Sequence, residues 1–439
     1  MFPWGLSCLS VLGAAGTALL CAGLLLSLAQ HLWTLRWTLS RDRASALPLP
    51  KGSMGWPFFG ETLHWLVQGS RFHSSRRERY GTVFKTHLLG RPVIRVSGAE
   101  NVRTILLGEH RLVRSQWPQS AHILLGSHTL IGSVGEPHRQ RRKVLARAFS
   151  RAALQRFVPR LQGVLRREVR SWCAARRPVA VYQASKALTF RMAARILLGL
   201  RLDDAQCAEL ARTFEQFVEN LFSLPLDVPF SGLRKGIRAR DQLHRYLEEA
   251  ITEKLHEDKA AELSDALDMI IHSTRELGHE LSVQELKETA VELLFAAFLT
   301  TASASTSLVL LLLQKRSTGP PGGAEGEPLS SLQMGKLRPR EERERERQCA
   351  SWSGGSPHSP QGYQIPKGWS VMYSIRDTHE TAAVYGSPPE GFDPERFGAA
   401  GEESRCACGR FHYIPFGGGA RSCLGQELAQ AGRPPPAVE

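Results

Sequence analysis

The chain has few cysteines, and their spacing predicts no disulfide framework. Its 439 residues include eight, at positions 8, 21, 173, 207, 349, 406, 408 and 423. This pattern differs from the dense cysteine spacing of small secreted domains and suits a reducing compartment. The chain also has no internal repeat, and no linker divides its first three hundred residues, so we expect one large domain.

The N-terminus lacks charged side chains. Residues 1–33 contain no lysine, arginine, aspartate or glutamate, and the stretch is long enough to span a bilayer. Arg36, Arg41 and Arg43 follow, and positive charge after a span favours retention of that side in the cytoplasm. We predict a transmembrane signal anchor over 1–33 and a basic, Pro-rich hinge over 34–55. A cleaved signal peptide is the alternative, but no basic region precedes the apolar stretch.

Acidic residues are outnumbered by basic ones, which gives a formal net charge of +14. This balance suits an anionic partner, which could be nucleic acid, phospholipid headgroups or an acidic protein surface. A strongly basic helix is expected to open at Gly135, and its run from Arg139 to Lys143 could be a nucleic-acid patch. No aromatic residue is interleaved there, so we predict no nucleic-acid partner, and the apolar N-terminus favours the membrane as the anionic partner.

Apolar periodicity predicts a mainly α-helical body with a small β-sheet subdomain. The segments 83–87 and 92–96 flank Gly90 as a hairpin. Apolar residues recur at helical spacing over 154–169 and over 243–255.

One helix is unusually long. It begins at a capping box of Ser282 and Glu285 and runs to about Gln314, with no charged residue over 293–313. Hydropathy alone would also allow a second transmembrane span. Six Ser or Thr residues over 300–307 favour a buried helix beside a polar cleft instead.

The most informative residue is Cys423, within the run Phe416-Gly417-Gly418-Gly419-Ala420-Arg421-Ser422-Cys423-Leu424-Gly425. Glycines let backbone N–H groups approach the sulfur, and Arg421 adds a cation, so the run is expected to hold a thiolate. A buried cysteine beside a glycine-rich turn is the alternative. A dinucleotide loop is disfavoured, because GxGxxG spacing and a ribose-binding acid are missing.

The spacing of Phe416, Gly419, Arg421, Cys423 and Gly425 resembles the heme-ligand loop of the cytochrome P-450 monooxygenases. The resemblance implies a heme b cofactor with Cys423 as the axial ligand of the iron. Arg421 would pair with a heme propionate, and Phe416 would shield the sulfur. Gly425 would let the following helix pass close to the porphyrin.

Two further segments carry the same resemblance. In the long helix, Thr300 matches the family threonine that relays protons to dioxygen, while Leu299 stands where an acid is usual. A hydroxyl that bonds only to its own helix is the alternative for Thr300. In the basic helix, His138 and Arg142 match two family residues that bind heme propionates, although His138 replaces a tryptophan.

Over about residues 1–314 and 362–431 the chain resembles the retinoic-acid hydroxylase branch of the family. The resemblance rests on the segments 80–92, 106–113 and 220–225. By that similarity Trp117, Phe222 and Phe295 would line an apolar pocket for a polyene, although each could equally be ordinary core.

The resemblance fails between residues 315 and 361, where Gly, Pro, Ser, Arg and Glu dominate and no folded core is expected. The family carries a Glu-x-x-Arg helix in this interval that binds a meander arginine, here Arg396. Glu342 with Arg345, or Glu344 with Arg347, fits the bare pattern by composition alone. We therefore expect that helix to be missing, and residues 432–439 to be a non-family tail.

These expectations combine into an incomplete cytochrome P-450 fold with an N-terminal membrane anchor helix. Residues 56–314 would form the N-terminal part of the monooxygenase domain, and residues 362–431 the meander and heme-thiolate loop. The resemblance implies hydroxylation of retinoic acid with electrons from an NADPH-dependent reductase, at the endoplasmic reticulum membrane with the body on the cytosolic side. A catalytically inactive isoform that at most binds heme is the alternative, and a membrane-anchored nucleic-acid binder is a remote one.

Overall fold

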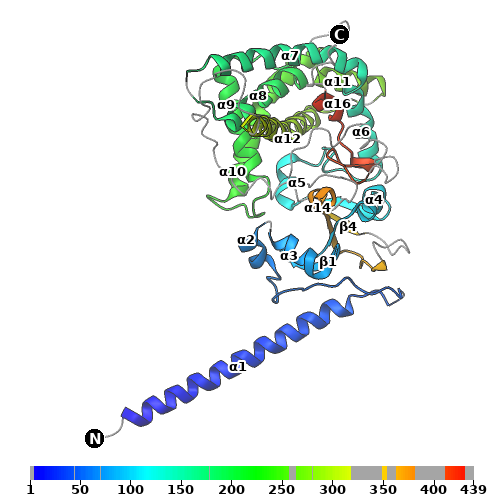
Figure 1. The fold of residues 1–439 in the computed structure, drawn as a ribbon. Helices are drawn as coiled ribbons and strands as arrows, with labels where there is room; N and C mark the ends of the chain where they lie inside the picture. Colours follow the sequence, from blue (N-terminus) through cyan, green and yellow to red (C-terminus); the bar gives the residue numbers. More distant parts are fainter. Residues whose placement is uncertain are drawn as a thin grey trace. The chain divides into compact units, whose positions relative to one another are not determined.

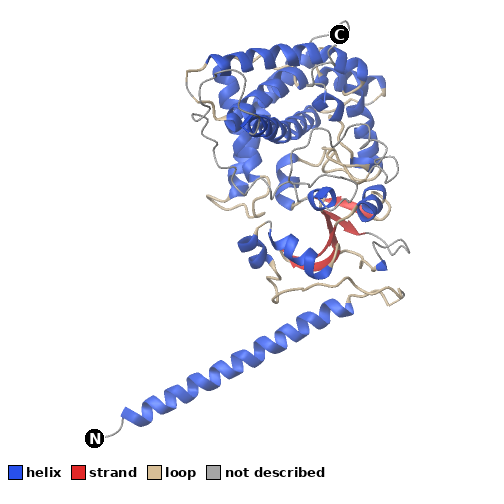
Figure 2. Ribbon diagram, in the orientation of Figure 1, coloured by secondary structure: helices blue, strands red, loops and turns tan. Residues whose placement is uncertain are grey.

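The computed structural model describes residues 4–43, 45–69, 71–176, 178–256, 264–278, 280–317, 349–352, 362–380 and 411–430. The chain divides into two compact units. Unit 1 comprises Met1–Gln116 and Pro339–Arg421, and unit 2 comprises Trp117–Arg338 and Ser422–Glu439. Figure 1 traces the elements along the chain, and Figure 2 shows that helices predominate, as predicted.

Unit 1 contains the sheet. Its strands are β1 (Val83–Leu88), β2 (Arg91–Val96), β3 (Val113–Gln116), β4 (Cys349–Trp352) and β5 (Ser370–Tyr373), in the order β1-β2-β5-β4-β3. Its helices are α1 (Trp4–Leu39), α2 (Thr62–Gln68), α3 (Arg71–Tyr80), α4 (Ala99–Leu107), α14 (Ile375–Glu380) and the 3₁₀ turn η5 (Gly419–Arg421).

The predicted hairpin is confirmed by the pairing of β1 with β2, in which Val83 lies opposite Val96. Leu89 and Gly90 both adopt positive φ, of 51° and 77°, which a two-residue turn between twisted strands requires. Strand β5 then pairs with β2 in parallel, so a segment from late in the chain completes the sheet.

Strand β4 differs from the sequence-based expectation. Residues 349–352 lie within the predicted non-family insert, yet their backbone pairs antiparallel with both β3 and β5. The prediction was wrong for these four residues, because composition does not reveal that two strand edges are available for pairing. Arg396 and the Glu-Arg run over 341–347 lie outside the described residues.

Helix α1 is longer than the predicted anchor of 1–33 and continues to Leu39. The residues after Trp33 include no proline or glycine before Pro48, so nothing in the sequence stops the helix at the first arginine. The predicted hinge over 34–55 is therefore helical in its first part.

The described part of unit 2 consists of helices and the loops that join them. Its elements are α5 (Gln119–Leu125), α6 (Glu136–Ala148), α7 (Arg151–Ala174), α8 (Val181–Met192), the π-helix η1 (Ala193–Leu197), α9 (Asp204–Asn220), α10 (Gly232–His256), α11 (Ala266–Glu276), α12 (Val283–Ser317) and α16 (Gln426–Gln430). The predicted helical patterns over 154–169 and 243–255 fall inside α7 and α10.

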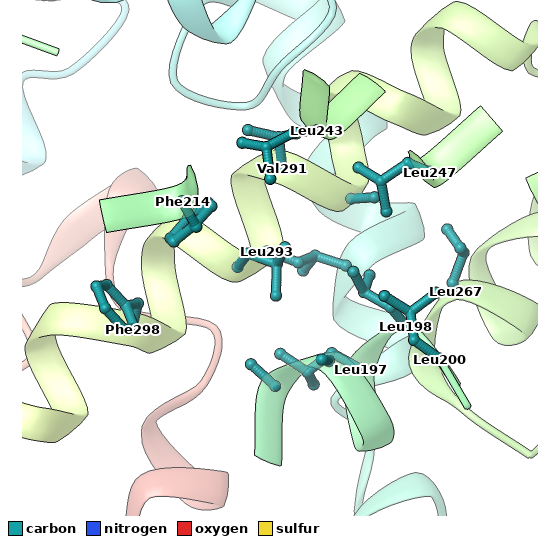
Figure 3. Close-up of a cluster of buried hydrophobic side chains, with 14 of the residues drawn as sticks. Leu197, Leu198, Leu200, Phe214, Leu243, Leu247, Leu267, Val291, Leu293 and Phe298 are labelled. Carbon is teal, nitrogen blue, oxygen red and sulfur yellow. The ribbon is translucent and has the colours of Figure 1, made fainter. Parts of the chain in front are cut away.

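Helix α12 is the predicted long helix, and its capping box is present. The Ser282 Oγ accepts from the Glu285 N–H at 3.2 Å, and the Glu285 carboxylate accepts from the Ser282 N–H at 3.1 Å. In the core of unit 2, Val291, Leu293 and Phe298 of this helix lie among side chains of neighbouring helices (Figure 3). Each large apolar side chain buried in this way contributes about 1.5–3 kcal/mol.

Two described helices, α1 and α12, are long and apolar enough to cross a membrane. They differ in their surroundings. The leucines of α1 are exposed along much of its length, whereas α12 packs against α8 and α10. Buried Glu288 and Glu292 also lie on α12. These contacts place residues 286–302 of α12 in the core of unit 2, whereas Leu308 and Leu312 near its end are 55% and 54% exposed. Helix α1 is the candidate anchor.

Candidate functional site

The first part of the Cys423 loop belongs to unit 1, and its glycines have the freedom that the sequence suggested. Gly417 and Gly419 adopt positive φ, of 68° and 66°. A Cβ atom on Gly419 would lie 2.1 Å from the carbonyl oxygen of Leu106, which is in α4. Glycine at position 419 is therefore required both by backbone conformation and by close packing.

Arg421 is paired within unit 1. Its Nε donates to Glu109 Oε1 at 2.8 Å, and the Arg421 and Glu109 side chains are 20% and 9% exposed. Glu109 also accepts from the backbone N–H of Ser115, at the same oxygen, at 3.2 Å. The propionate contact predicted for Arg421 is not tested by this pair and stays a prediction.

Cys423 lies in the short part of the loop that belongs to unit 2, which begins at Ser422, and its side chain is exposed. Desolvation by the atoms packed around the sulfur raises the pKa of the thiol, while the Gly425 N–H and the Arg142 charge act to lower it. The thiolate expected at Cys423 is not tested by these opposing influences and stays a prediction. A bound metal ion would stabilise the thiolate, because a coordinated thiol loses its proton.

Helix α6 brings Arg142 to this part of the loop. Arg142 Nη2 donates to the Ser422 carbonyl oxygen at 2.7 Å and to Ser422 Oγ at 3.0 Å. His138, one turn earlier on the same helix, is buried. The two residues matched by resemblance thus share a helix whose arginine contacts the residue before Cys423.

The other arginines of α6 are also engaged inside unit 2. Arg139 pairs with Glu136 at 3.2 Å, and Arg141 pairs with Glu285 at 3.3 Å while donating to the His128 carbonyl. The Arg139 and Glu136 side chains are nevertheless 65% and 62% exposed, so the charge of Arg139 remains at the surface. The expectation of no nucleic-acid partner is not tested by these pairs and stays a prediction.

The three predicted pocket residues lie together in unit 2. Trp117 stacks on Phe222 with ring centroids 6.0 Å apart, and its edge meets Phe295 at 6.3 Å. All three are partly buried against the helical core. They come from the segment before α5, the segment after α9, and α12, so their proximity is a product of the fold.

Thr300 lies on α12 with its side chain exposed, and its hydroxyl donates to the Ala296 carbonyl at 2.6 Å. This is the bond back to its own helix that the sequence left open as an alternative. A role in proton delivery therefore stays a prediction.

Sequence reasoning missed two buried carboxylates that shape unit 2. Glu292 accepts from the backbone N–H groups of Leu130 and Ile131, each at 2.8 Å. Glu288 accepts from the N–H of His128 at 2.8 Å. They hold the segment between α5 and α6. Helix α5 follows Trp117, and helix α6 carries His138 and Arg142. The signal available in the sequence was the presence of Glu288 and Glu292 among the apolar residues of α12.

Comparisons with known proteins agree with this arrangement. The family model for Cytochrome P450 matches residues 50–318 and 355–431. Cytochrome P450 26C1 of Homo sapiens is 78% identical over 467 residues, which cover 98% of this chain and 90% of that protein. Cytochrome P450 26B1 of Danio rerio is 50% identical over 440 residues, covering 96% and 86%.

A solved structure described as retinoic acid bound cyanobacterial CYP120A1 is 31% identical, with a TM-score of 0.73, and covers 88% of this chain and 90% of that one. The interval that the family model leaves unmatched, 319–354, falls inside the predicted insert.

The donor set fits a heme-thiolate group. The Cys423 sulfur is accessible, and the Gly425 N–H and the Arg142 charge both favour its thiolate form. Close packing also requires glycine at position 419. Taken with the family match over most of the chain, these features show that the chain belongs to the cytochrome P450 family of heme-thiolate monooxygenases.

Proposed function

We propose that this chain is a membrane-anchored monooxygenase that binds heme b through Cys423 and hydroxylates retinoic acid. The observation that carries the proposal is the intact Cys423 loop, with Arg142 bonded to Ser422 and its charge favouring the thiolate. When bound, the heme would supply the activation of dioxygen, using the electron density of a thiolate ligand.

The protein's share in holding heme falls to a small set of residues. Arg142, His138 and Arg421 would bind the propionates, where cations and hydrogen-bond donors match carboxylate oxygens. Phe416 would shield the sulfur, while Gly419 and Gly425 would allow close approach of the backbone. The existing Arg421–Glu109 contact would orient the guanidinium before it meets a propionate.

Trp117, Phe222 and Phe295 would bind the polyene chain of the substrate. Their rings already pack together, and rigid aromatic side chains bury large apolar area at low entropic cost. The cyanobacterial structural relative is described as bound to retinoic acid. That relative, together with the resemblance of the sequence to the retinoic-acid hydroxylase branch, supports a retinoid substrate here.

Thr300 would hold a water molecule for proton delivery. Leu299 cannot transfer a proton, whereas the Thr300 hydroxyl beside it can both donate and accept a hydrogen bond. To bind water, the Thr300 hydroxyl would either break its hydrogen bond to the Ala296 carbonyl or accept a hydrogen bond from water while still donating to that carbonyl.

Electrons would come from an NADPH-dependent reductase, and α1 would anchor the chain in the endoplasmic reticulum membrane. Arg36, Arg41 and Arg43 favour a cytosolic location for the body, because positive charge after a span resists translocation.

Reconstitution tests the function directly. The purified full chain would be incubated in lipid vesicles with an NADPH-dependent reductase, NADPH and retinoic acid, and products would be identified by mass spectrometry. We expect a product heavier by one oxygen atom, with the label retained from ¹⁸O₂. Absence of that product from heme-loaded protein would contradict the proposal.

A second candidate function is that of a heme-binding but inactive chain. It is favoured by the family-unmatched interval of 319–354, where a helix with Glu-x-x-Arg would be expected. Without that helix Arg396 would lose its expected partners, and an unpaired buried cation costs several kcal/mol.

A chimera separates the two candidates. Residues 319–354 would be replaced by the corresponding segment of the human Cytochrome P450 26C1 relative, and heme content and turnover compared with the unaltered chain. Equal turnover in both would support the active enzyme. Turnover only in the chimera would establish the inactive candidate for this chain.

A further inference from the structure

Helix α14 is tied to the rest of unit 1 by two buried polar side chains, Asp377 and Thr378. The Asp377 carboxylate accepts from Arg77 Nη1 at 2.8 Å, and its second oxygen lies 3.8 Å from Arg95 Nη2. The Thr378 hydroxyl accepts from the backbone N–H of Gly98 at 3.1 Å. These partners belong to α3, to β2 and to the residue before α4, so three other elements set the position of this short helix.

His379, the next residue of α14, contacts the chain that leads to the Cys423 loop. Its Nε2 accepts a hydrogen bond from the backbone N–H of Ile414 at 2.8 Å, across 35 positions of sequence. The His379 ring also lies 4.8 Å from the Tyr413 ring, centroid to centroid. Ile414 is 5% exposed and packs in a core cluster of unit 1. The half-buried histidine therefore fixes residues 413 and 414 on α14.

The backbone of Ile414 links this contact to the glycine-rich loop. Its carbonyl oxygen accepts from the Gly417 N–H at 2.9 Å, which closes a turn that contains Phe416, the residue predicted to shield the sulfur. At the far end of the same loop, Arg421 donates to Glu109 at 2.8 Å. The loop is thus attached to unit 1 before its first glycine and again at its arginine.

The hydrogen bond from Ile414 requires a neutral imidazole. Nε2 accepts only when it carries no proton, and an imidazolium has two N–H donors and no acceptor. Burial lowers the pKa of His379 from 6.5 to about 4, although the charge of Glu380 acts to raise it. Glu380, which pairs with Arg376 at 2.6 Å, flanks the ring on α14, and the Tyr413 phenol flanks it on the loop. The acceptor therefore persists at neutral pH and is lost as pH falls toward 4.

We propose that His379 is a positioning residue for the heme-ligand loop, because its neutral Nε2 fixes Ile414 and the turn that contains Phe416. It acts through the backbone of Ile414 on the loop that carries Cys423. Loss of the acceptor, by substitution or by protonation, would release the start of the loop and so weaken the bond between the sulfur and heme iron. The inference rests on the heme binding proposed above and adds a residue to it.

Two substitutions separate the hydrogen bond from the ring. His379→Phe keeps an aromatic ring beside Tyr413 but has no acceptor, whereas His379→Gln keeps an acceptor oxygen and has no group that titrates in this pH range. His64→Phe, at an exposed histidine of α2, is the matched control.

Hydrogen exchange tests the contact itself, with or without heme. Protection of the Ile414 amide in the purified full chain would be resolved by mass spectrometry and compared with that of the Ser374 amide, which donates to the Val96 carbonyl. We expect His379→Phe to lower the relative protection of Ile414 about fivefold at pH 7, and His379→Gln to restore it. In the unaltered chain that protection should fall toward pH 4, whereas in His379→Gln it should not. Unchanged protection in His379→Phe would overturn the proposal.

The spectrum of the reduced, carbon monoxide-bound protein tests the consequence for the loop. The long-wavelength Soret band of thiolate-ligated heme should decay about fivefold faster in His379→Phe, and at the unaltered rate in His379→Gln and His64→Phe. Equal decay in His379→Phe and the unaltered chain would overturn the positioning role. A chain that lacks the band in every variant would contradict heme binding through Cys423, and the exchange of Ile414 would still decide whether His379 holds this residue.

Discussion

Glu109 accepts a hydrogen bond from Arg421 Nε at 2.8 Å, across 312 positions of sequence. Glu109 follows α4, and Arg421 ends the 3₁₀ turn that leads toward Cys423. The same helix supplies the Leu106 carbonyl that packs against Gly419. The segment around α4 therefore supports the thiolate loop at two points, one ionic and one steric.

The change Glu109→Gln should weaken this support. It removes the charge of a largely buried carboxylate, and hydrogen bonds to charged groups contribute about 2 kcal/mol. We expect a comparable loss in unfolding free energy, measured by chemical denaturation, together with faster heme loss. Glu100→Gln is the matched control, because Glu100 is 82% exposed in its pair with Arg103. Equal stability of the two variants would contradict the supporting role.

His73 should make unit 1 sensitive to acid. Burial, with the nearby charges of Arg95 and Arg76, lowers its pKa from 6.5 to about 2. The unfolded chain would take up a proton near pH 6.5 that the folded chain excludes, so stability present above that pH is lost as pH falls toward 2. One such proton gives a slope of about 1.4 kcal/mol per pH unit.

This slope is measurable by denaturant titrations between pH 6 and pH 4. His73→Leu should lower the slope by about one proton, and replacement of exposed His64 by leucine is the control. A slope that His73→Leu leaves unaltered would show that His73 is not buried as a neutral ring.

Trp117→Ala should weaken retinoic acid binding by about tenfold, because it removes the ring that contacts both Phe222 and Phe295. The dissociation constant would be measured from the shift of the heme absorption on titration with retinoic acid. Trp172→Ala, at a half-buried tryptophan near the end of α7, should leave it unchanged. Equal affinities of the two variants for retinoic acid would show that Trp117, Phe222 and Phe295 are ordinary core residues that do not bind the substrate.

Thr300→Val should separate NADPH consumption from product formation. If the hydroxyl delivers protons, product formed per NADPH should fall on the order of tenfold or more. Thr306 makes a similar bond, to the Ala302 carbonyl at 2.8 Å, so Thr306→Val controls for loss of such a bond. The same ratio of product to NADPH in both variants would show that Thr300 has no role in proton delivery beyond its hydrogen bond within the helix.

Local signals in the sequence predicted much of the fold. The Ser282–Glu285 box, the hairpin around Gly90 and the helical patterns all describe neighbours a few residues apart, where residue type constrains conformation directly. Helix α1 ran past its predicted end because the prediction followed charge, which stops a membrane span but does not stop a helix.

Distant pairings could not be predicted in the same way. Nothing local marks Glu109 as the partner of Arg421, or Ser422 as that of Arg142. Strand β4 likewise depends on two strands from other parts of the chain. The opposing influences on the Cys423 thiol, desolvation against the Gly425 N–H and the Arg142 charge, likewise arise from packing that the loop sequence does not reveal.

The absorption spectrum of the reduced, carbon monoxide-bound protein tests the central claim most directly. We expect the long-wavelength Soret band of a thiolate-ligated heme from the purified full chain, and its loss in Cys423→His with heme still bound. A chain that binds heme without that band, or a Cys423→His variant that keeps it, would contradict the assignment of Cys423 as the iron ligand.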